Sequence, residues 1–166
     1  GLLPINASEL DGEESKGINL DINHRLEIAD ESSLTSNVLF FYTEIDGKVE
    51  ISEQGDLNVF TQLDDPVTTQ GAELNLIFSF DELRYFVGYT YVDAKQQTPT
   101  GDIDLPFVSK HRFNNVLVWE RENNFRIGLE AYYFSEQLRD NDVTGESYWI
   151  FGLMTEKKIG SSITAF

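Results

Sequence analysis

The chain of 166 residues contains no cysteine, which excludes a disulfide framework, a thiol nucleophile and a thiolate metal site. It contains two histidines, His24 and His111, which lie far apart in the sequence. A Gly-x-Ser-x-Gly elbow, a phosphate-binding loop and a His-Glu-x-x-His helix are all missing. We therefore expect no enzyme activity, no catalytic residues, no cofactor and no resident metal ion.

Positive charge is also scarce: the chain contains 12 Lys and Arg against 29 Asp and Glu, which gives a formal net charge of −17. Binding to nucleic-acid phosphates requires clusters of Lys and Arg, so this composition argues against a nucleic-acid partner. No stretch approaches the roughly 18 consecutive apolar residues of a membrane-spanning helix. A transmembrane β-barrel stays possible, since its strands alternate apolar and polar residues and look only mildly hydrophobic.

What the sequence does contain is strict alternation, first in "GINLDINHRLEI" (Gly17–Ile28), where Ile and Leu occupy every second position. Such a period of two is typical of a β-strand with one apolar face. Alternation or strand composition recurs in seven further stretches: Leu34–Ile45, Ala72–Phe80, Leu83–Val92, Arg112–Glu120, Phe125–Phe134, Ser147–Glu156 and Ile159–Phe166. No stretch keeps a helical period with a cap. The fold class predicted is all-β, an antiparallel up-and-down meander of about eight strands.

The connections between these strands alternate in length. Short ones are Ala29–Ser32, Asp81–Glu82, Arg121–Asn124 and Lys157–Gly160, and long ones run over residues 46–71, 93–111 and 135–146. In an antiparallel meander, alternate connections lie at the same end of the sheet. Outer-membrane barrels have this asymmetry, with short periplasmic turns and long extracellular loops. The pattern favours a transmembrane β-barrel.

Aromatic residues, 13% of the chain, gather near the two ends of the predicted strands. Those near the long loops are Phe40, Phe41, Tyr42, Tyr89, Tyr91, Tyr132, Tyr133, Phe134, Tyr148 and Trp149, and those near the short turns are Phe78, Phe80, Trp119 and Phe125. Two bands of this kind are typical of the aromatic girdles of membrane barrels. We expect the apolar face to meet lipid, although His24 falls on that face and Val116 and Val118 fall on the other.

The polar face would line an aqueous lumen through Asn19, Asp21, Asn23, Arg25, Glu27, Glu73, Asn75, Arg84, Arg126 and Glu130. Direct ligand contact is better suited to the long loops, which carry Phe60, Gln62, Gln96, Gln97, Arg139 and Asn141. None of these residues carries a motif that would assign it to a ligand, so the ligand-binding residues stay unknown at this point.

One acidic loop, "DNDVTGE" (Asp140–Glu146), begins like an EF-hand calcium loop. The bidentate Glu that such a loop needs at its twelfth position is replaced by Phe151. A second pair, Asp102 and Asp104 in "GDID", could also touch a cation. We expect a polar hairpin loop at the first position and a solvated loop at the second.

Three segments together resemble a known family: "VTTQGAELNL" (Val67–Leu76), "FVGYTYVDAK" (Phe86–Lys95) and "LPFVSKHRFNNVLVWE" (Leu105–Glu120), followed by "FRIGLEAYY". Their order and spacing resemble the C-terminal part of the barrel of TonB-dependent outer-membrane receptors. The resemblance extends from about Gly17 to Phe166. It implies that residues 1–166 are a partial β-barrel domain within a barrel of about 22 strands. The plug domain and the closing C-terminal strands are not recognised in the sequence.

The function implied by this resemblance is active import across the bacterial outer membrane of a ferric siderophore or a similar bulky nutrient. The implied partners are outer-membrane lipid, the plug domain, the remaining strands and, through the plug, TonB. Two alternatives stay open at this point. A soluble β-barrel that binds a small ligand would turn the same apolar face inward, and a passive porin-like channel would lack the coupling to TonB.

Overall fold

A computed structural model describes residues 10–54, 57–139, 143–160 and 163–166. Regular structure in these residues consists of β-strands only, arranged in one nine-stranded sheet and two two-stranded sheets. None of the described segments forms a helix that is long and apolar enough to cross a membrane.

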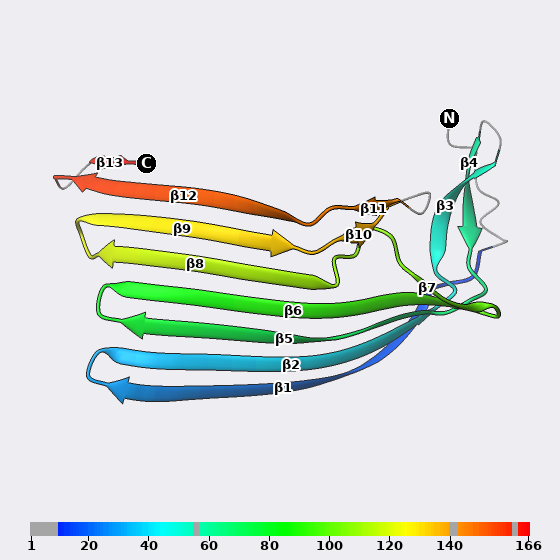
Figure 1. Cartoon of the computed structure of the whole chain (residues 1–166), viewed down its shortest axis with the longest axis horizontal. Coiled ribbons are helices and arrows are strands. Elements are labelled where there is room, and N and C mark those ends of the chain that lie inside the picture. Colours follow the sequence, from blue (N-terminus) through cyan, green and yellow to red (C-terminus); the bar gives the residue numbers. More distant parts are fainter. Residues whose placement is uncertain (1–9, 55–56, 140–142, 161–162) are drawn as a thin grey trace. The chain divides into compact units, whose positions relative to one another are not determined.

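The nine-stranded sheet is an up-and-down meander (Figure 1). Its neighbours follow the order β1-β2-β5-β6-β8-β9-β12-β13, and β7 pairs with β6 outside this path. The strands are β1 (Glu14–Ala29), β2 (Ser32–Asp46), β5 (Val67–Phe80), β6 (Leu83–Thr98), β7 (Gly101–Asp104), β8 (His111–Arg121), β9 (Phe125–Phe134), β12 (Tyr148–Ile159) and β13 (Ile163–Ala165). The eight path strands confirm the predicted all-β antiparallel meander, and each corresponds to one of the eight stretches identified in the sequence.

The long connections contain more strand than the sequence indicated. β5 begins at Val67, not at Ala72, and β6 continues to Thr98, beyond Val92. The end of β6 is polar, so hydrophobic alternation does not extend to it. This part of β6 is nevertheless a strand, because residues such as Lys95 pair with β7. Two further hairpins lie in these connections, β3 (Val49–Gln54) with β4 (Leu57–Gln62), and β10 (Gln137–Leu138) with β11 (Thr144–Gly145).

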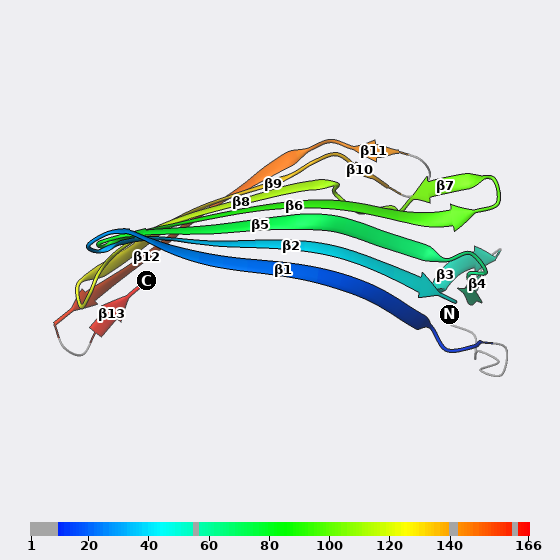
Figure 2. The same cartoon turned by 90° about the horizontal axis from the view of Figure 1, so that it is seen from below.

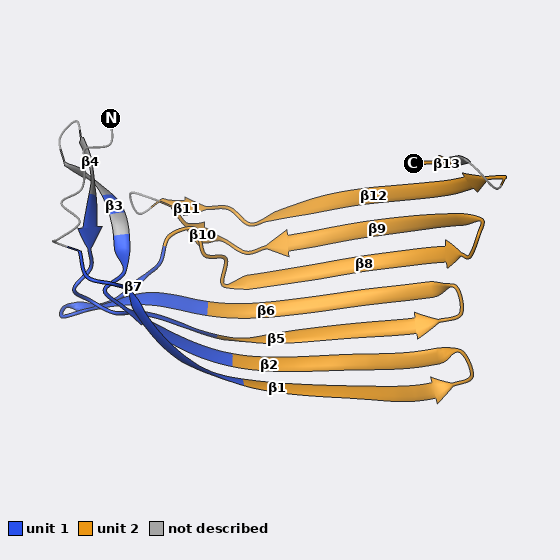
Figure 3. Cartoon of the chain, turned by 180° about the vertical axis from the view of Figure 1, so that it is seen from behind, with its two compact units in different colours: residues 1–19, 41–70, 93–105 blue, residues 20–40, 71–92, 106–166 orange. Residues whose placement is uncertain are grey.

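The chain divides into two compact units, which are coloured separately in Figure 3. Unit 1 comprises residues 1–19, 41–70 and 93–105 and holds β3, β4 and β7. Unit 2 comprises residues 20–40, 71–92 and 106–166 and holds the main part of the long strands together with the short turns. Figure 2 shows the strands of unit 2 as a single twisted layer.

Cross-strand register in unit 2 separates the two faces of the sheet. Tyr85 lies opposite Leu117, Leu117 lies opposite Leu129, and Leu129 lies opposite Leu153, so one apolar row crosses four strands. Directly paired residues of antiparallel strands point to the same side, and their chain neighbours point to the other side. We call the side of this row the apolar face.

The opposite side, the polar face, carries Glu130, which lies opposite Val116 and Gly152. Arg84 lies on the same side because it pairs with Val118. Val116 and Val118, which are apolar, therefore lie on the polar face, as the alternation predicted. His24, the other misfit, is exposed on β1.

The aromatic band near the long connections is divided between the faces. Tyr133 pairs with Trp149 on the apolar face, with ring centroids 5.1 Å apart. Phe134 pairs with Tyr148 on the polar face, where the rings stack at 5.0 Å. A run such as Tyr132–Phe134 cannot share one face because successive strand residues alternate. Only part of this band can therefore form a lipid-facing girdle.

Very little of the described chain is buried. The buried hydrophobic residues are Val67, Val92 and Ala94, whereas Phe151 and Leu153 on the apolar face are 75% and 70% exposed. In the described residues no second layer covers the apolar face of unit 2. A sheet with one apolar face is stable only when something buries that face, so this fold requires an apolar environment or partner.

The turn between β5 and β6 is fastened to the end of β8. The Glu82 carboxylate accepts hydrogen bonds from Arg121 Nε at 2.8 Å and from Trp119 Nε1 at 3.1 Å. The bond from Arg121, followed by that from Trp119, lowers the pKa of Glu82 below its usual value because both favour the charged carboxylate. Asp81, which precedes it, has a φ of 49°, the left-handed conformation found in tight turns.

A pH-dependent effect follows for Glu82→Gln. A group with a depressed folded-state pKa stabilises the fold above its unfolded pKa, and this contribution is lost as the pH falls through the folded value. The variant should unfold at lower urea concentration than the wild type at pH 7, and the difference should shrink toward pH 3. Glu122→Gln, which removes a charge from another turn without breaking these contacts, serves as control. An equal difference at both pH values would contradict the role of the charged form.

Candidate functional site

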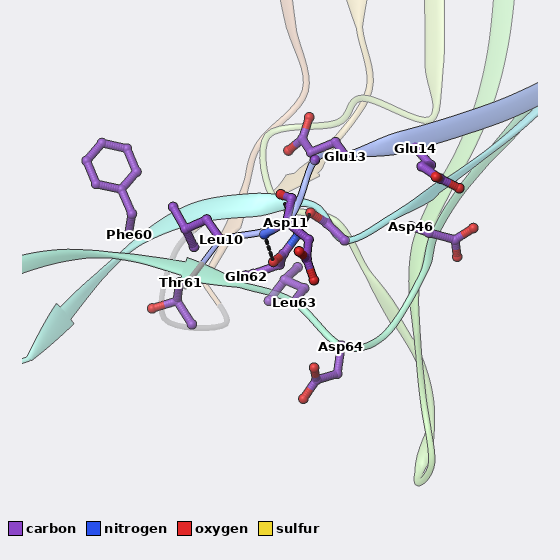
Figure 4. Close-up of a pocket in the computed structure, with 12 residues that line it drawn as sticks. Leu10, Asp11, Glu13, Glu14, Asp46, Phe60, Thr61, Gln62, Leu63 and Asp64 are labelled. Atoms are coloured by element: carbon purple, nitrogen blue, oxygen red, sulfur yellow. Dashed lines mark hydrogen bonds between the residues drawn. The ribbon is translucent and has the colours of Figure 1, made fainter. Parts of the chain in front are cut away.

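A cavity of about 1140 Å³ in unit 1 is the candidate ligand site (Figure 4). Three segments form it: residues 10–14 before and at the start of β1, residues 46–47 at the end of β2, and residues 60–64 at and after the end of β4. Pockets for small ligands have volumes of several hundred to about 1000 Å³. We call this cavity the loop pocket.

Gln62 holds the segments of the loop pocket together. Its Nε2 donates to the backbone oxygens of Asp11 at 3.0 Å and of Gly47 at 2.8 Å, and its Oε1 accepts from Asp11 N at 2.9 Å. A second link joins the same segments, since Val49 N donates to Glu13 Oε1 at 2.6 Å. Figure 4 shows Gln62 beside Asp11 within the pocket. Gln62 is thus a structural clamp between the segment that precedes β1 and the β2–β3 connection.

The backbone at Gly47 explains why a glycine stands there. Its φ is +67°, in the left-handed region that other residues enter only with strain. A Cβ added at this position would lie 2.7 Å from Gln62 Nε2, too close for any real contact. Glycine therefore permits both the turn and the approach of the Gln62 amide.

Carboxylates dominate the lining of the loop pocket. Asp11, Glu13, Glu14, Asp46 and Asp64 line it, and its described lining includes no Lys or Arg. Leu10, Phe60 and Leu63 supply its apolar part. A site of this charge attracts cationic and hydrogen-bond-donating groups and repels free anions.

One cation lies close to this region of unit 1. Lys16 Nζ lies 3.0 Å from Glu44 Oε1 and 3.4 Å from Asp46 Oδ2. The pair with Asp46 offsets part of the negative charge at one margin of the pocket. The Lys16 side chain is 69% exposed, so it gains little stability from these pairs.

The loop residues that the sequence analysis placed better for ligand contact than the strand residues are only partly brought together. Phe60 and Gln62 both line the loop pocket, but Gln62 uses its amide as a clamp. Gln96 and Gln97 lie on β6 opposite Ile103 and Asp102 of β7 and do not line this pocket. Arg139 belongs to unit 2. Asn141 lies outside the described residues.

The acidic segment Asp11–Glu14, which lines the pocket, was not identified from the sequence as part of a site. Its signal is the run "DGEE", which ends two residues before a predicted strand. That run is equally typical of a solvated loop. Only the contacts of Asp11 with Gln62, 51 positions away, place it in the pocket.

The loop that begins like an EF-hand forms a hairpin, as expected. Gln137 lies opposite Gly145 and Leu138 lies opposite Thr144. Residues 140–142, which include Asp140 and Asp142, lie outside the described part of the chain. Asp102 and Asp104 are part of β7, where they pair with Gln97 and Lys95 of β6. Among described residues no group of three His, Asp or Glu side chains is arranged to hold a metal ion.

Amide side chains form a continuous band on the polar face of unit 2. Asn37 Nδ2 donates to Asp21 Oδ1 and, at 3.0 Å, to Asn23 Oδ1. Asn23 Nδ2 also donates to Asp21 at 2.8 Å, and Asn75 Nδ2 reaches Asn37 Oδ1 at 3.5 Å. The band therefore crosses from β1 through β2 to β5. It brings together three of the residues predicted to line the lumen.

Gly88 extends this band toward β8. A Cβ at Gly88 would lie 3.1 Å from Asn75 Oδ1 and 3.4 Å from Asn114 Nδ2, so the missing side chain leaves room for both amides. The predicted lumen residues Arg84, Arg126 and Glu130 share this face by register. Arg126 Nη2 pairs with Glu120 Oε1 at 2.6 Å. Hydrogen-bonded amides and the Arg126–Glu120 ion pair therefore occupy this part of the polar face.

Gln62→Ala should loosen the loop pocket without unfolding the sheet. It removes hydrogen bonds that each contribute about 0.5–1.5 kcal/mol. Hydrogen exchange at the Asp11 amide should then accelerate by roughly 2- to 10-fold. Gln97→Ala, which deletes an exposed amide elsewhere in unit 1, is the control. Unchanged exchange at Asp11 in Gln62→Ala would rule out the clamp.

The comparison with solved structures identifies a similar fold. The FrpB iron transporter from Neisseria meningitidis (F3-3 variant) superimposes with a TM-score of 0.64 over 88% of this chain, at 12% sequence identity. The match covers 24% of that transporter, so this chain spans about a quarter of its length. At this identity the likeness establishes the fold alone.

The comparison with sequence families covers almost the whole chain. No curated protein matches it. The model of the family "TonB dependent receptor-like, beta-barrel" matches residues 3–165. The chain therefore belongs to the TonB-dependent receptor-like β-barrel family.

Proposed function

We propose that this chain is a piece of the wall and outer loops of an outer-membrane importer that is energised through TonB. Its proposed cargo is a ferric siderophore or a similar bulky nutrient. The family match supports the class of protein, and the structural neighbour is itself described as an iron transporter. The missing part of the barrel, the plug domain and, through the plug, TonB are the proposed partners.

The observation that carries this proposal is the length and boundary of the apolar face. β8 has 11 residues and β9 has 10, and a transmembrane β-strand needs about 9–11. On this face Trp119 and Phe125 lie at the short-turn end, and Tyr133 and Trp149 lie at the other. Aromatic residues at both boundaries of an apolar band match the two interfaces of a bilayer.

The near absence of a core favours this interpretation over a soluble barrel. A soluble barrel buries its apolar residues in its own interior. Here Phe151 and Leu153 are 75% and 70% exposed, and the buried hydrophobic residues in the described chain are Val67, Val92 and Ala94. Lipid acyl chains would cover such a face.

In this orientation the polar face borders an aqueous lumen, and the loop pocket belongs to the extracellular connections. The amide band and the Arg126–Glu120 pair stay hydrated there. The carboxylates of the loop pocket favour a cargo that presents cationic or hydroxyl groups. Among siderophores, those with amine or hydroxyl substituents are the best candidates.

Import is tested with the complete receptor in its own host. Deletion of the receptor should abolish uptake of radioactive iron supplied with one member of a panel of siderophores. Deletion of TonB should abolish the same uptake, because only an energised importer needs it. Uptake that persists without TonB, together with steady conductance of the purified complete receptor in a planar bilayer, would favour a passive channel.

Orientation in the membrane is tested at two adjacent positions of β12. Leu153 lies on the apolar face, opposite Leu129, and Met154 lies on the polar face, opposite Gly128. Leu153→Arg should destabilise the folded receptor by about 2–4 kcal/mol, the cost of Arg at the bilayer centre. Met154→Arg should have a much smaller effect, since it points to the lumen.

The measurement is the folded fraction of the complete receptor in lipid vesicles as a function of urea concentration. The folded fraction is read from the change in gel mobility on heating. Both substitutions introduce the same side chain one residue apart, so strand propensity is matched. A larger loss in Met154→Arg than in Leu153→Arg would place lipid on the wrong face.

A further inference from the structure

The apolar face of unit 2 ends in cations where it meets the short turns. Arg121 of β8 lies opposite Phe125 of β9, and Phe125 lies opposite Lys157 of β12. All three belong to the apolar face, because they are an even number of residues from Leu117, Leu129 and Leu153. Arg121 and Lys157 are exposed. We call these three residues with Trp119 the cationic rim.

Aromatic rings form the centre of the cationic rim. Trp119 and Phe125 pack edge to face, with ring centroids 4.7 Å apart. Lys157 Nζ lies 5.9 Å from the centre of the Phe125 ring and donates a hydrogen bond to Asn124 Oδ1. An ammonium over an aromatic ring is favourable, and Lys at the end of an apolar surface keeps its charge at the water boundary.

The two cations differ in how they are compensated. Arg121 is paired with Glu82, whereas Lys157 contacts the neutral Asn124 amide and the Phe125 ring. The other acids of the neighbouring turns, Asp81 and Glu122, line a separate cavity of about 540 Å³ together with Arg84, Glu120 and Arg126. Lys157 is therefore a positive charge without an acidic partner among the described residues, in a chain with a net charge of −17.

We propose that the cationic rim is a binding site for an anionic phospholipid of the periplasmic leaflet, with Lys157 Nζ as the main ligand of the headgroup phosphate. The proposal rests on the membrane orientation given above. The ammonium supplies charge-assisted hydrogen bonds to phosphate oxygens. Trp119 and Phe125 lie at the level of the glycerol backbone, and the row of Leu117, Leu129 and Leu153 continues along the acyl chains.

This continuity selects a phospholipid over free phosphate. A phospholipid uses both parts of the surface, because its phosphate meets the cation and its acyl chains cover the apolar row. Free phosphate would use the cation alone and would gain nothing from the adjoining hydrophobic residues. Arg121 is the weaker contributor, because Glu82 already occupies its Nε.

The test is native mass spectrometry of the complete receptor, purified in detergent and titrated with phosphatidylglycerol. Lys157→Gln should weaken binding of the most tightly held lipid by about fivefold, the typical effect of one cation near an anionic headgroup. Lys157→Arg should retain the binding. Lys158→Gln is the matched control, because Lys158 is the next residue on the same strand, is exposed and points to the polar face.

Two further arms identify the ligand. Phosphatidylcholine, which is zwitterionic, should bind less tightly to the wild type and should not distinguish Lys157→Gln from Lys158→Gln. Inorganic phosphate at millimolar concentration should not displace phosphatidylglycerol. Displacement by inorganic phosphate would assign a free-anion site and overturn the proposal. Equal loss in Lys157→Gln and Lys158→Gln, or no loss in either, would also overturn it.

Failure of this proposal is separable from failure of the proposed function. If the Leu153→Arg and Met154→Arg pair behaves as expected but Lys157→Gln binds phosphatidylglycerol like the wild type, only the lipid site is refuted. If that pair shows the reverse order, the membrane orientation is refuted and the lipid site is refuted with it.

Discussion

The register between antiparallel strands is the constraint on which the rest of this molecule depends. Once Leu117 lies opposite Leu129 and Leu129 opposite Leu153, the face of every neighbouring residue in these strands is determined. A slip of one residue would move Glu130 to the apolar face and Leu129 to the polar one. In the proposed membrane orientation, moving each large apolar side chain from lipid to water would cost about 1.5–3 kcal/mol. In the proposed membrane orientation, the alternation keeps the apolar side chains in lipid and the charged side chains in water.

The two faces then take different physical roles. The apolar face is exposed and has aromatic rings at both of its ends. The polar face carries the amide band of Asn23, Asn37 and Asn75 and the Arg126–Glu120 pair. Membership of a receptor family agrees with this division and confirms that the chain is not an enzyme.

The connections add specificity to this common wall. In unit 1 the amide of Gln62 hydrogen-bonds backbone groups of two segments of the loop pocket at once. At the short turns Glu82 fastens Trp119 and Arg121, while Lys157 keeps its charge without an acidic partner in the described residues. Both arrangements join residues that are 15 to 51 positions apart.

The sequence alone located the eight path strands and the short turns, and it determined the faces of the strands that alternate clearly, because a period of two needs only local information. The positions of Val116 and Val118 on the polar face followed from that period, whereas the faces of the last two strands did not. Tertiary structure alone decided the strand content of the long connections, because these segments contain polar residues such as Lys95 and lack a clear hydrophobic alternation. It also decided the loop pocket, since Asp11 and Gln62 meet only when distant segments fold together. Local periodicity indicates to which face of the sheet a side chain points, whereas contact between distant segments depends on the path of the whole chain.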